Sequence, residues 1–446
     1  MLRNILIISI GLLILVGCEK NKNPMKPKPE TTFKVRIDNI SPAVMFSASG
    51  VFNTPLGKMT PSPAGPGEAF EFSFDAAPGS KLSFATMFAQ SNDFFYAPSE
   101  SGIALFDNNG SQVTGDVTAQ IHLWDAGTEI NQEPGVGMDQ APRQSGPNTG
   151  IADPDNSVRL APDDFGNLPM ASDVIKVMLT STSATGFTVR IENVSDASTL
   201  QTSDGSTQLI PLSPGIWVIH TTDAPLFTSG QPDRGEGLEA IAEDGNPSAI
   251  SGVIGMKAGI KQLISPGVWA LHKKADVIFT EGEADRGEGL ESLAEDGNPT
   301  ALGVSLADKD NISASGVFNT PVGASQPGPA GPGSAFEFII TTSEDYYLSF
   351  AQMLGQTNDL FFAPNGMGIK LFEGSGMPIT GDVTSQVMLW DAGTEVNEVP
   401  GVGLNQAPRQ PAPNTGVDEN GVVHLVNDGF SYPDVSEIIK VTIETE

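Results

Sequence analysis

Apolar and polar residues alternate with a period of two along several short stretches of the chain. Residues 33–37 and 70–74 place Phe, Val or Ile at every second position. This spacing predicts β-strands with one buried face. Turn-forming pairs such as Asn109-Gly110 and Asn365-Gly366 fall between such stretches. The pattern predicts an all-β protein built from antiparallel β-sandwiches of about eight strands each.

Two short segments have helical spacing instead. Leu238, Ile241 and Ala242 lie on one apolar face of a helix predicted over 235–244, and 287–296 repeats that pattern. A glycine follows each segment, where a helix is commonly capped and ended.

Internal repeats predict the domain organisation. Residues 47–150 recur as 313–416 without a gap, whereas the opening strand 33–39 recurs earlier, as 187–193. The second copy therefore contains extra residues between its opening strand and the rest of the repeat.

The extra residues are themselves duplicated, because 214–220 returns as 266–272. The sequence predicts two β-sandwich domains in tandem, the second holding a duplicated insert with short helices. An exchange of strands between the copies stays open at this stage. The predicted units are a signal peptide 1–17, a lipid anchor and tether 18–31, domain 1 over 32–184, and domain 2 over 185–446 with the insert 211–300.

Composition supports a β-rich acidic protein. The chain contains 49 Gly and 34 Pro, which favours short strands and tight turns over long helices. Its 23 basic and 54 acidic residues give a net charge of −31. Such a chain would repel phosphate backbones, so we expect no binding to nucleic acid. The carboxylates either keep the surface soluble or attract divalent cations.

The N-terminus resembles a bacterial lipoprotein signal. Arg3 precedes an apolar run that ends in Leu15-Val16-Gly17-Cys18, as in a lipobox. Cys18 is the only cysteine and is the expected lipidation site. We therefore expect a lipid anchor in the bacterial cell envelope, at the outer membrane or cell surface.

Repeated carboxylates are the main candidates for chemistry. Asp93 recurs as Asp359, and the motif 124–129, Trp-Asp-Ala-Gly-Thr-Glu, recurs as 390–395. Two carboxylates four residues apart across a glycine turn can converge on a hard cation such as calcium. The alternative is that the aspartates only cap turns through side-chain to backbone hydrogen bonds.

The motifs at 82–95, 124–129, 266–272 and 293–298 together resemble the spondin N-terminal domain family. That family has a β-sandwich related to C2 domains, and its extracellular members bind calcium and serve adhesion. The resemblance implies calcium as a cofactor. It implies as ligands Asp93, Asp125 and Glu129 in the first copy and Asp359, Asp391 and Glu395 in the second.

The sequence thus predicts a cell-surface lipoprotein that acts as an adhesion module, or binds an extracellular protein or glycan. No catalysis is predicted. Two alternatives are a secreted hydrolase that uses the insert's histidines and acidic residues, and a purely structural envelope protein. His220 and His272 each follow a Trp, and we interpret them as strand residues because no second His or Cys stands at metal-ligand spacing.

Overall fold

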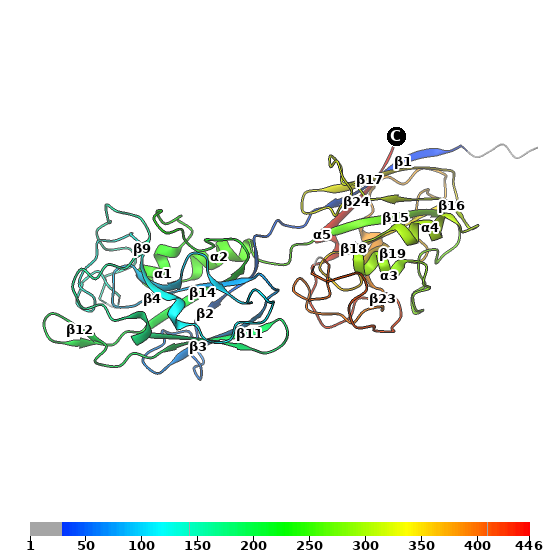
Figure 1. The fold of residues 1–446 in the computed structure, drawn as a ribbon. Helices are drawn as coiled ribbons and strands as arrows, with labels where there is room; N and C mark the ends of the chain where they lie inside the picture. The colour runs from blue at the N-terminus through cyan, green and yellow to red at the C-terminus, as the bar shows by residue number, and fades with distance from the viewer. Residues whose placement is uncertain (1–28, 142, 408) are drawn as a thin grey trace, which may run out of the picture.

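The computed structural model describes residues 29–446 except Pro142 and Pro408. Antiparallel strands form two β-sandwiches, here named sandwich A and sandwich B, each carrying short helices (Figure 1). The predicted all-β sandwich fold is confirmed. The signal peptide, Cys18 and most of the tether lie outside the described residues. Within the described part, no helix is long and apolar enough to cross a membrane.

Sandwich A has a four-stranded sheet in the order β3-β11-β10-β7 and a larger sheet in the order β2-β14-β4-β5-β8-β9, with β6 beside β4. Its elements are β2 (Phe46–Phe52), β3 (Ala69–Asp75), β4 (Lys81–Phe88), β5 (Phe94–Pro98), β6 (Ile103–Ala104), β7 (Gly115–Asp116), β8 (Ile121–Asp125), β9 (Arg159–Leu160), β10 (Ile175–Ser181), β11 (Gly186–Asn193), β14 (Leu212–His220), α1 (Leu238–Asp244) and α2 (Ser248–Met256), with a separate hairpin of β12 (Leu200–Gln201) and β13 (Thr207–Gln208).

Sandwich B repeats this arrangement, with sheets in the orders β17-β1-β24-β21 and β16-β15-β18-β19-β22-β23, and β20 beside β18. Its elements are β1 (Thr31–Asn39), β15 (Ile264–His272), α3 (Leu290–Asp296), α4 (Thr300–Ala307), β16 (Ile312–Phe318), β17 (Ala335–Thr342), β18 (Tyr347–Leu354), β19 (Leu360–Pro364), β20 (Ile369–Lys370), β21 (Gly381–Asp382), β22 (Val387–Asp391), β23 (His424–Leu425), α5 (Val435–Ile438) and β24 (Ile439–Thr445).

The strand pairing places the domain boundaries differently from the sequence prediction. Strand β1 pairs with β17 and β24 of sandwich B, whereas β11 pairs with β3 and β10 of sandwich A. The reason is local: β10 and β11 form a hairpin closed by the hydrogen bond from Thr182 N to Gly186 O. In sandwich B, β1 takes the corresponding place, between β17 and β24. A boundary at 184/185 therefore does not separate the sandwiches.

The duplicated insert is also shared between the sandwiches. Strand β14 lies between β2 and β4, and its duplicate β15 lies between β16 and β18. Each sandwich thus contains one copy of the Trp-His strand, and the predicted assignment of both copies to the second domain is corrected. Sandwich A is inserted in the chain of sandwich B, between β1 and β15.

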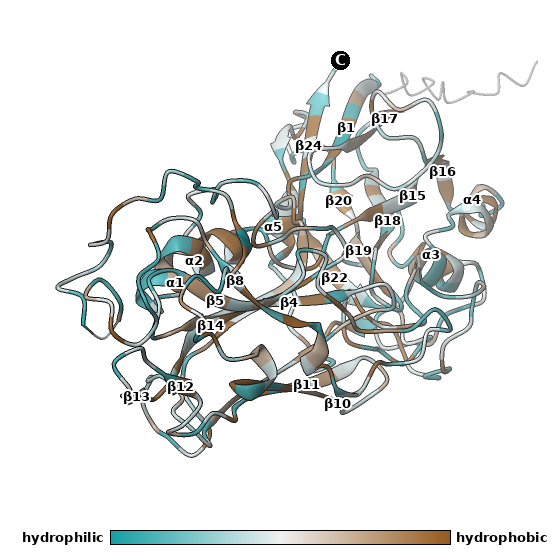
Figure 2. Cartoon of the chain, turned by 60° about the vertical axis from the view of Figure 1, so that its left-hand side comes forward, coloured by the Kyte–Doolittle hydropathy of each residue, from teal (hydrophilic) through white to brown (hydrophobic). Residues whose placement is uncertain are grey.

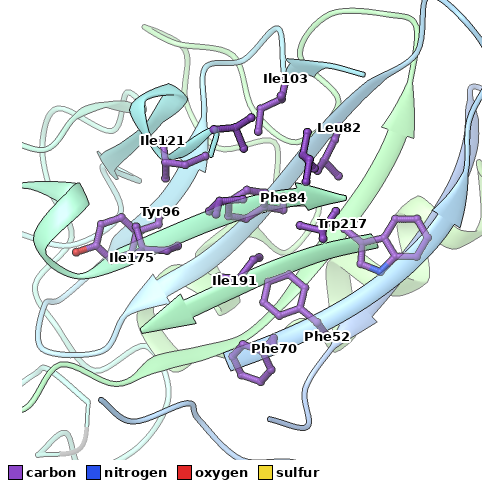
Figure 3. Close-up of a cluster of buried hydrophobic side chains, with 14 of the residues drawn as sticks. Phe52, Phe70, Leu82, Phe84, Tyr96, Ile103, Ile121, Ile175, Ile191 and Trp217 are labelled. Atoms are coloured by element: carbon purple, nitrogen blue, oxygen red, sulfur yellow. The ribbon is translucent and has the colours of Figure 1, made fainter. Parts of the chain in front are cut away.

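Each core lies between the two sheets of a sandwich. In sandwich A, Phe70 and Ile191 of the small sheet pack with Phe84 and Tyr96 of the large sheet, and all four are fully buried (Figure 3). Figure 2 shows hydrophobic residues concentrated along the strands, with largely hydrophilic loops. Burial of apolar surface is the main stabilising contribution to such a fold.

The helices form a third layer on the outer face of each large sheet. In sandwich A, Leu238 and Ile241 of α1 and Ile254 of α2 pack in one cluster with Phe95 and Ile216. The predicted helices are confirmed as α1 and α3, and the glycines that follow them adopt a left-handed φ of 65°. The helices α2 and α4 were not predicted.

Candidate metal centre

Two predicted carboxylates of each sandwich meet where neighbouring strands begin and end. In sandwich B, Asp359 immediately precedes β19, and Asp391 ends β22 opposite Leu360. The equivalent register in sandwich A pairs Phe94 with Asp125. The antiparallel pairing therefore brings Asp359 beside Asp391, and Asp93 beside Asp125.

A tight turn wraps around these carboxylates in sandwich B. Asp391 Oδ1 accepts a hydrogen bond from Gly393 N at 2.7 Å, which is the turn cap considered as the alternative to a metal ligand. Asp359 Oδ2 accepts hydrogen bonds from Thr394 N at 2.7 Å and Glu395 N at 3.2 Å. Each aspartate thus uses one oxygen to hold the turn.

Two further oxygens of the site lack hydrogen-bond partners. The remaining oxygen of Asp391, Oδ2, accepts a hydrogen bond from Asn397 Nδ2 at 2.7 Å. Asp359 Oδ1 and Asn397 Oδ1 are buried and have no hydrogen-bond partner. A buried oxygen without a donor is costly, and a cation is one means of satisfying it.

Glu419 completes a group of three carboxylates that could hold a metal ion. Ligand oxygens of Asp359, Asp391 and Glu419 all lie within 4.8 Å of one another. Glu419 comes from the loop before β23, and its N donates to Thr394 O at 2.9 Å. The repeat pattern does not predict Glu419, because the gapless repeat ends at residue 416, before that loop.

Without a cation, burial disfavours the ionised form of the carboxylates at this site. Burial, and secondarily the nearby Asp391, raises the pKa of Asp359 to about 7. Burial likewise raises the pKa of Asp391 and of Glu419. A bound cation would favour the ionised carboxylates and reverse these shifts.

Sandwich A holds an arginine at the corresponding place. Arg159 Nη2 lies 2.8 Å from Asp125 Oδ2 and 2.7 Å from Asp153 Oδ2. Asp153 corresponds to Glu419, because its N also donates to the matching carbonyl, that of Thr128. Arg159 faces Asp125 in the sheet register in which His424 faces Asp391. The guanidinium thus supplies the positive charge in sandwich A.

The predicted ligands Glu129 and Glu395 point to a different place from the three-carboxylate group. Glu129 accepts hydrogen bonds from Gly150 N at 2.6 Å and Asn92 Nδ2 at 3.1 Å. Glu395 is 3% exposed, and its Oε1 has no hydrogen-bond partner. Neither belongs to the one group of at least three potential metal ligands found among the described residues.

The insert histidines are packed inside the sandwiches. His220 Nε2 lies 2.9 Å from Ser83 Oγ, and His272 Nε2 lies 2.8 Å from Ser349 Oγ. Both rings are fully buried, and the space beside Ser349 measures only about 10 Å³. These histidines are strand residues in tightly packed surroundings.

Comparison with known proteins adds no relative. No protein-family model matches the chain, and no curated protein matches it. The resemblance to spondin N-terminal domains therefore stays a prediction.

Proposed function

We propose that sandwich B binds calcium through Asp359, Asp391 and Glu419, and that the protein is a lipid-anchored cell-surface module that binds an extracellular protein or glycan. The carboxylate group within 4.8 Å is the observation that carries this proposal. Calcium takes six to eight oxygen ligands, and this site offers only oxygen donors apart from the neighbouring His424.

The unpartnered buried atoms agree with this fit but do not distinguish the two sandwiches, because Asp93 Oδ1 and Asn131 Oδ1 of sandwich A are unpartnered as well. Asp359 Oδ1 and Asn397 Oδ1 could add to the ligand set, while the loop hydrogen bonds keep both side chains in place. When bound, calcium would neutralise the carboxylates and stabilise the loop that follows β22. An ordered acidic loop at the end of a sandwich is a suitable surface for calcium-dependent binding.

The test is thermal unfolding of residues 19–446 with calcium and with EGTA. Calcium at 100 times its dissociation constant should stabilise the folded protein by about 2.7 kcal/mol and raise the melting temperature. Asp391→Asn, which keeps the turn cap, should lose most of this rise.

Asp125→Asn is the matched control in sandwich A, where Arg159 already compensates the charge. It should leave the calcium effect unchanged. A melting temperature that ignores calcium in the wild-type chain would refute the metal site and favour the purely structural role.

A further inference from the structure

The end of sandwich B at which β1 begins is the end nearest to the proposed lipid anchor. Thr31 starts β1 and pairs with Thr342, the last residue of β17. The C-terminus lies at the same end, because Glu446 N donates to Thr32 O at 3.0 Å (Figure 1). Thirteen residues along the chain separate Cys18 from Thr31, and a chain of that length reaches at most about 45 Å. This end of sandwich B is therefore held close to the anchored membrane.

Four segments meet at this end of sandwich B and are here named the anchor end. They are residues 273–276 after β15, 343–346 between β17 and β18, 365–368 between β19 and β20, and the hairpin 371–378. His272 at the end of β15 pairs with Tyr347, which in turn pairs with Lys370. Phe372 of the hairpin packs edge-on against Phe33 of β1, with ring centroids 5.3 Å apart. These contacts place the four segments around the start of β1.

The anchor end differs in chemistry from the same end of sandwich A. At five positions of the repeat, sandwich A has the small polar residues Ser80, Ser101, Ser111, Thr221 and Thr222. At the matching positions, sandwich B has Tyr346, Met367, Met377, Lys273 and Lys274. The exposed fraction is 43% for Met367 and 56% for Met377. The fold does not require these side chains, because sandwich A forms the same loops without them.

The side chains of the anchor end are of the kind found at membrane–water interfaces. Tyr346 packs its ring partly against the core of sandwich B, and Lys273 Nζ lies 4.3 Å from the centre of that ring. Tyrosine combines an apolar ring with a polar tip, and lysine keeps its charge in water while its stem covers apolar surface. Both residue types are common at the level of the lipid headgroups.

The charges of the anchor end indicate which lipid it suits. Lys273, Lys274 and Lys370 are exposed there, and so are the carboxylates of Asp276 and Glu373. The surface therefore carries both signs of charge, and the strongly acidic chain as a whole would be repelled by an anionic membrane. Zwitterionic headgroups, which present a phosphate and an ammonium group together, match this mixture.

We propose that the anchor end lies against the membrane surface, with Tyr346, Met367 and Met377 among zwitterionic lipid headgroups. The inference rests on the proposed lipid anchor, which makes a weak contact sufficient because it holds the surface at a high effective concentration. Strand β19 runs from Leu360 beside the metal group to Pro364 beside the anchor end. The metal group thus faces away from the membrane, where an extracellular ligand can reach it.

The test follows methionine oxidation by hydrogen peroxide in a chain that begins at Cys18. Because Cys18 is the only cysteine, it can be coupled specifically to a maleimide lipid in phosphatidylcholine vesicles. Mass spectrometry should show oxidation of Met367 and Met377 slowed about fivefold relative to the uncoupled chain, as expected if the contact is populated about four-fifths of the time. Met138 and Met256 of sandwich A, which are 69% and 77% exposed, should react at unchanged rates.

A triple variant replaces residues of the anchor end by those of sandwich A and keeps both methionine reporters. Lys273→Thr with Lys274→Thr and Tyr346→Ser should lose most of the slowing. Lys261→Thr is the matched control, because it removes an exposed lysine from the opposite end of sandwich B, before β15, and should keep the slowing. Melting temperatures establish that the variants fold.

Three results would overturn the inference. They are equal oxidation of Met367 and Met377 in the coupled and uncoupled chains, equal slowing of Met138 and Met256, and unchanged slowing in the triple variant. The anchor itself is tested separately, by the mass of the N-terminal peptide of the protein isolated from cells. A peptide without lipid on Cys18 would refute the anchor, whereas the coupled chain tests the membrane contact alone.

Discussion

At the scale of single residues, the two sandwiches differ in what lies opposite the buried aspartate that ends β8 or β22. Asp125 is fully buried in sandwich A, and Arg159 compensates its charge with a side chain that is 27% exposed. Asp391 of sandwich B has His424 opposite it instead. Two replacements, of Arg159 by His424 and of Asp153 by Glu419, thus separate a site with an internal cation from a site that could accept an external one.

Removing that internal cation should make sandwich A depend on calcium. Arg159→Ala leaves Asp125 and Asp153 uncompensated, and we expect a loss of about 2–3 kcal/mol, below the ~3–5 kcal/mol for fully buried pairs. Calcium should restore part of the loss, because Asp93, Asp125 and Asp153 hold the positions equivalent to the three carboxylates of sandwich B. Urea unfolding with calcium and with EGTA measures both effects.

The control for this variant is Arg190→Ala, which removes a surface pair with Glu192 at 3.3 Å. Such a pair contributes at most about 1 kcal/mol, and calcium should not alter the effect. If Arg159→Ala is no more destabilising than Arg190→Ala, the guanidinium does not hold the site together.

Buried carboxylates also predict the pH dependence of the metal-free protein. Burial raises the pKa of Glu243 and of Glu295 to about 8. The folded state then retains protons that the unfolded state releases, so stability should fall as pH rises from about 4.5 to 8. Each such proton contributes a slope of up to about 1.4 kcal/mol per pH unit.

Urea unfolding in EGTA between pH 5 and pH 8.5 measures this slope. Glu243→Gln with Glu295→Gln should reduce it, because the amides stay neutral throughout, and should leave the contribution of Asp93 and Asp359, whose pKa values burial raises to about 7. Stability that rises steadily to pH 8.5 in the wild type would contradict the shifts.

At the scale of elements, local pattern was enough to predict the strands but not their partners. The segments 33–39 and 187–193 have the same alternation, so neither sequence indicates the sandwich to which its strand belongs. Strand β11 belongs to sandwich A because a short hairpin connects it to β10. Local sequence therefore predicted the elements, and connectivity determined their assembly.

The helices and the site show the same limit. Helix α2 contains Gly252 and Gly255, which weaken a helical pattern, and it is held by packing of Ile250 and Ile254. Asp359 and Asp391 could be found because their motifs repeat. Glu419 could not, since only the backbone contact with Thr394 reveals its equivalence to Asp153.

At the scale of the whole molecule, sandwich A is a complete unit inserted in sandwich B. Its two ends meet, because Met45 N donates to Lys257 O at 2.8 Å and Gly259 N donates to Phe46 O at 2.9 Å. Adjacent ends are what permit insertion of one domain within another. Sandwich B, in contrast, needs β1 from the far end of the chain to fill its small sheet.

This architecture predicts which fragments fold. Residues 42–260 contain every strand and helix of sandwich A and should unfold cooperatively with a melting temperature of their own. Residues 32–184 lack β11, β14 and the helices, so they leave the core around Phe84 open and should not fold. A chain starting at residue 42 should retain sandwich A, while sandwich B loses the strand between β17 and β24. Circular dichroism and calorimetry of the three chains test this, and cooperative melting of 32–184 would show that sequence order, and not the exchange of β1 and β11, defines the folding units.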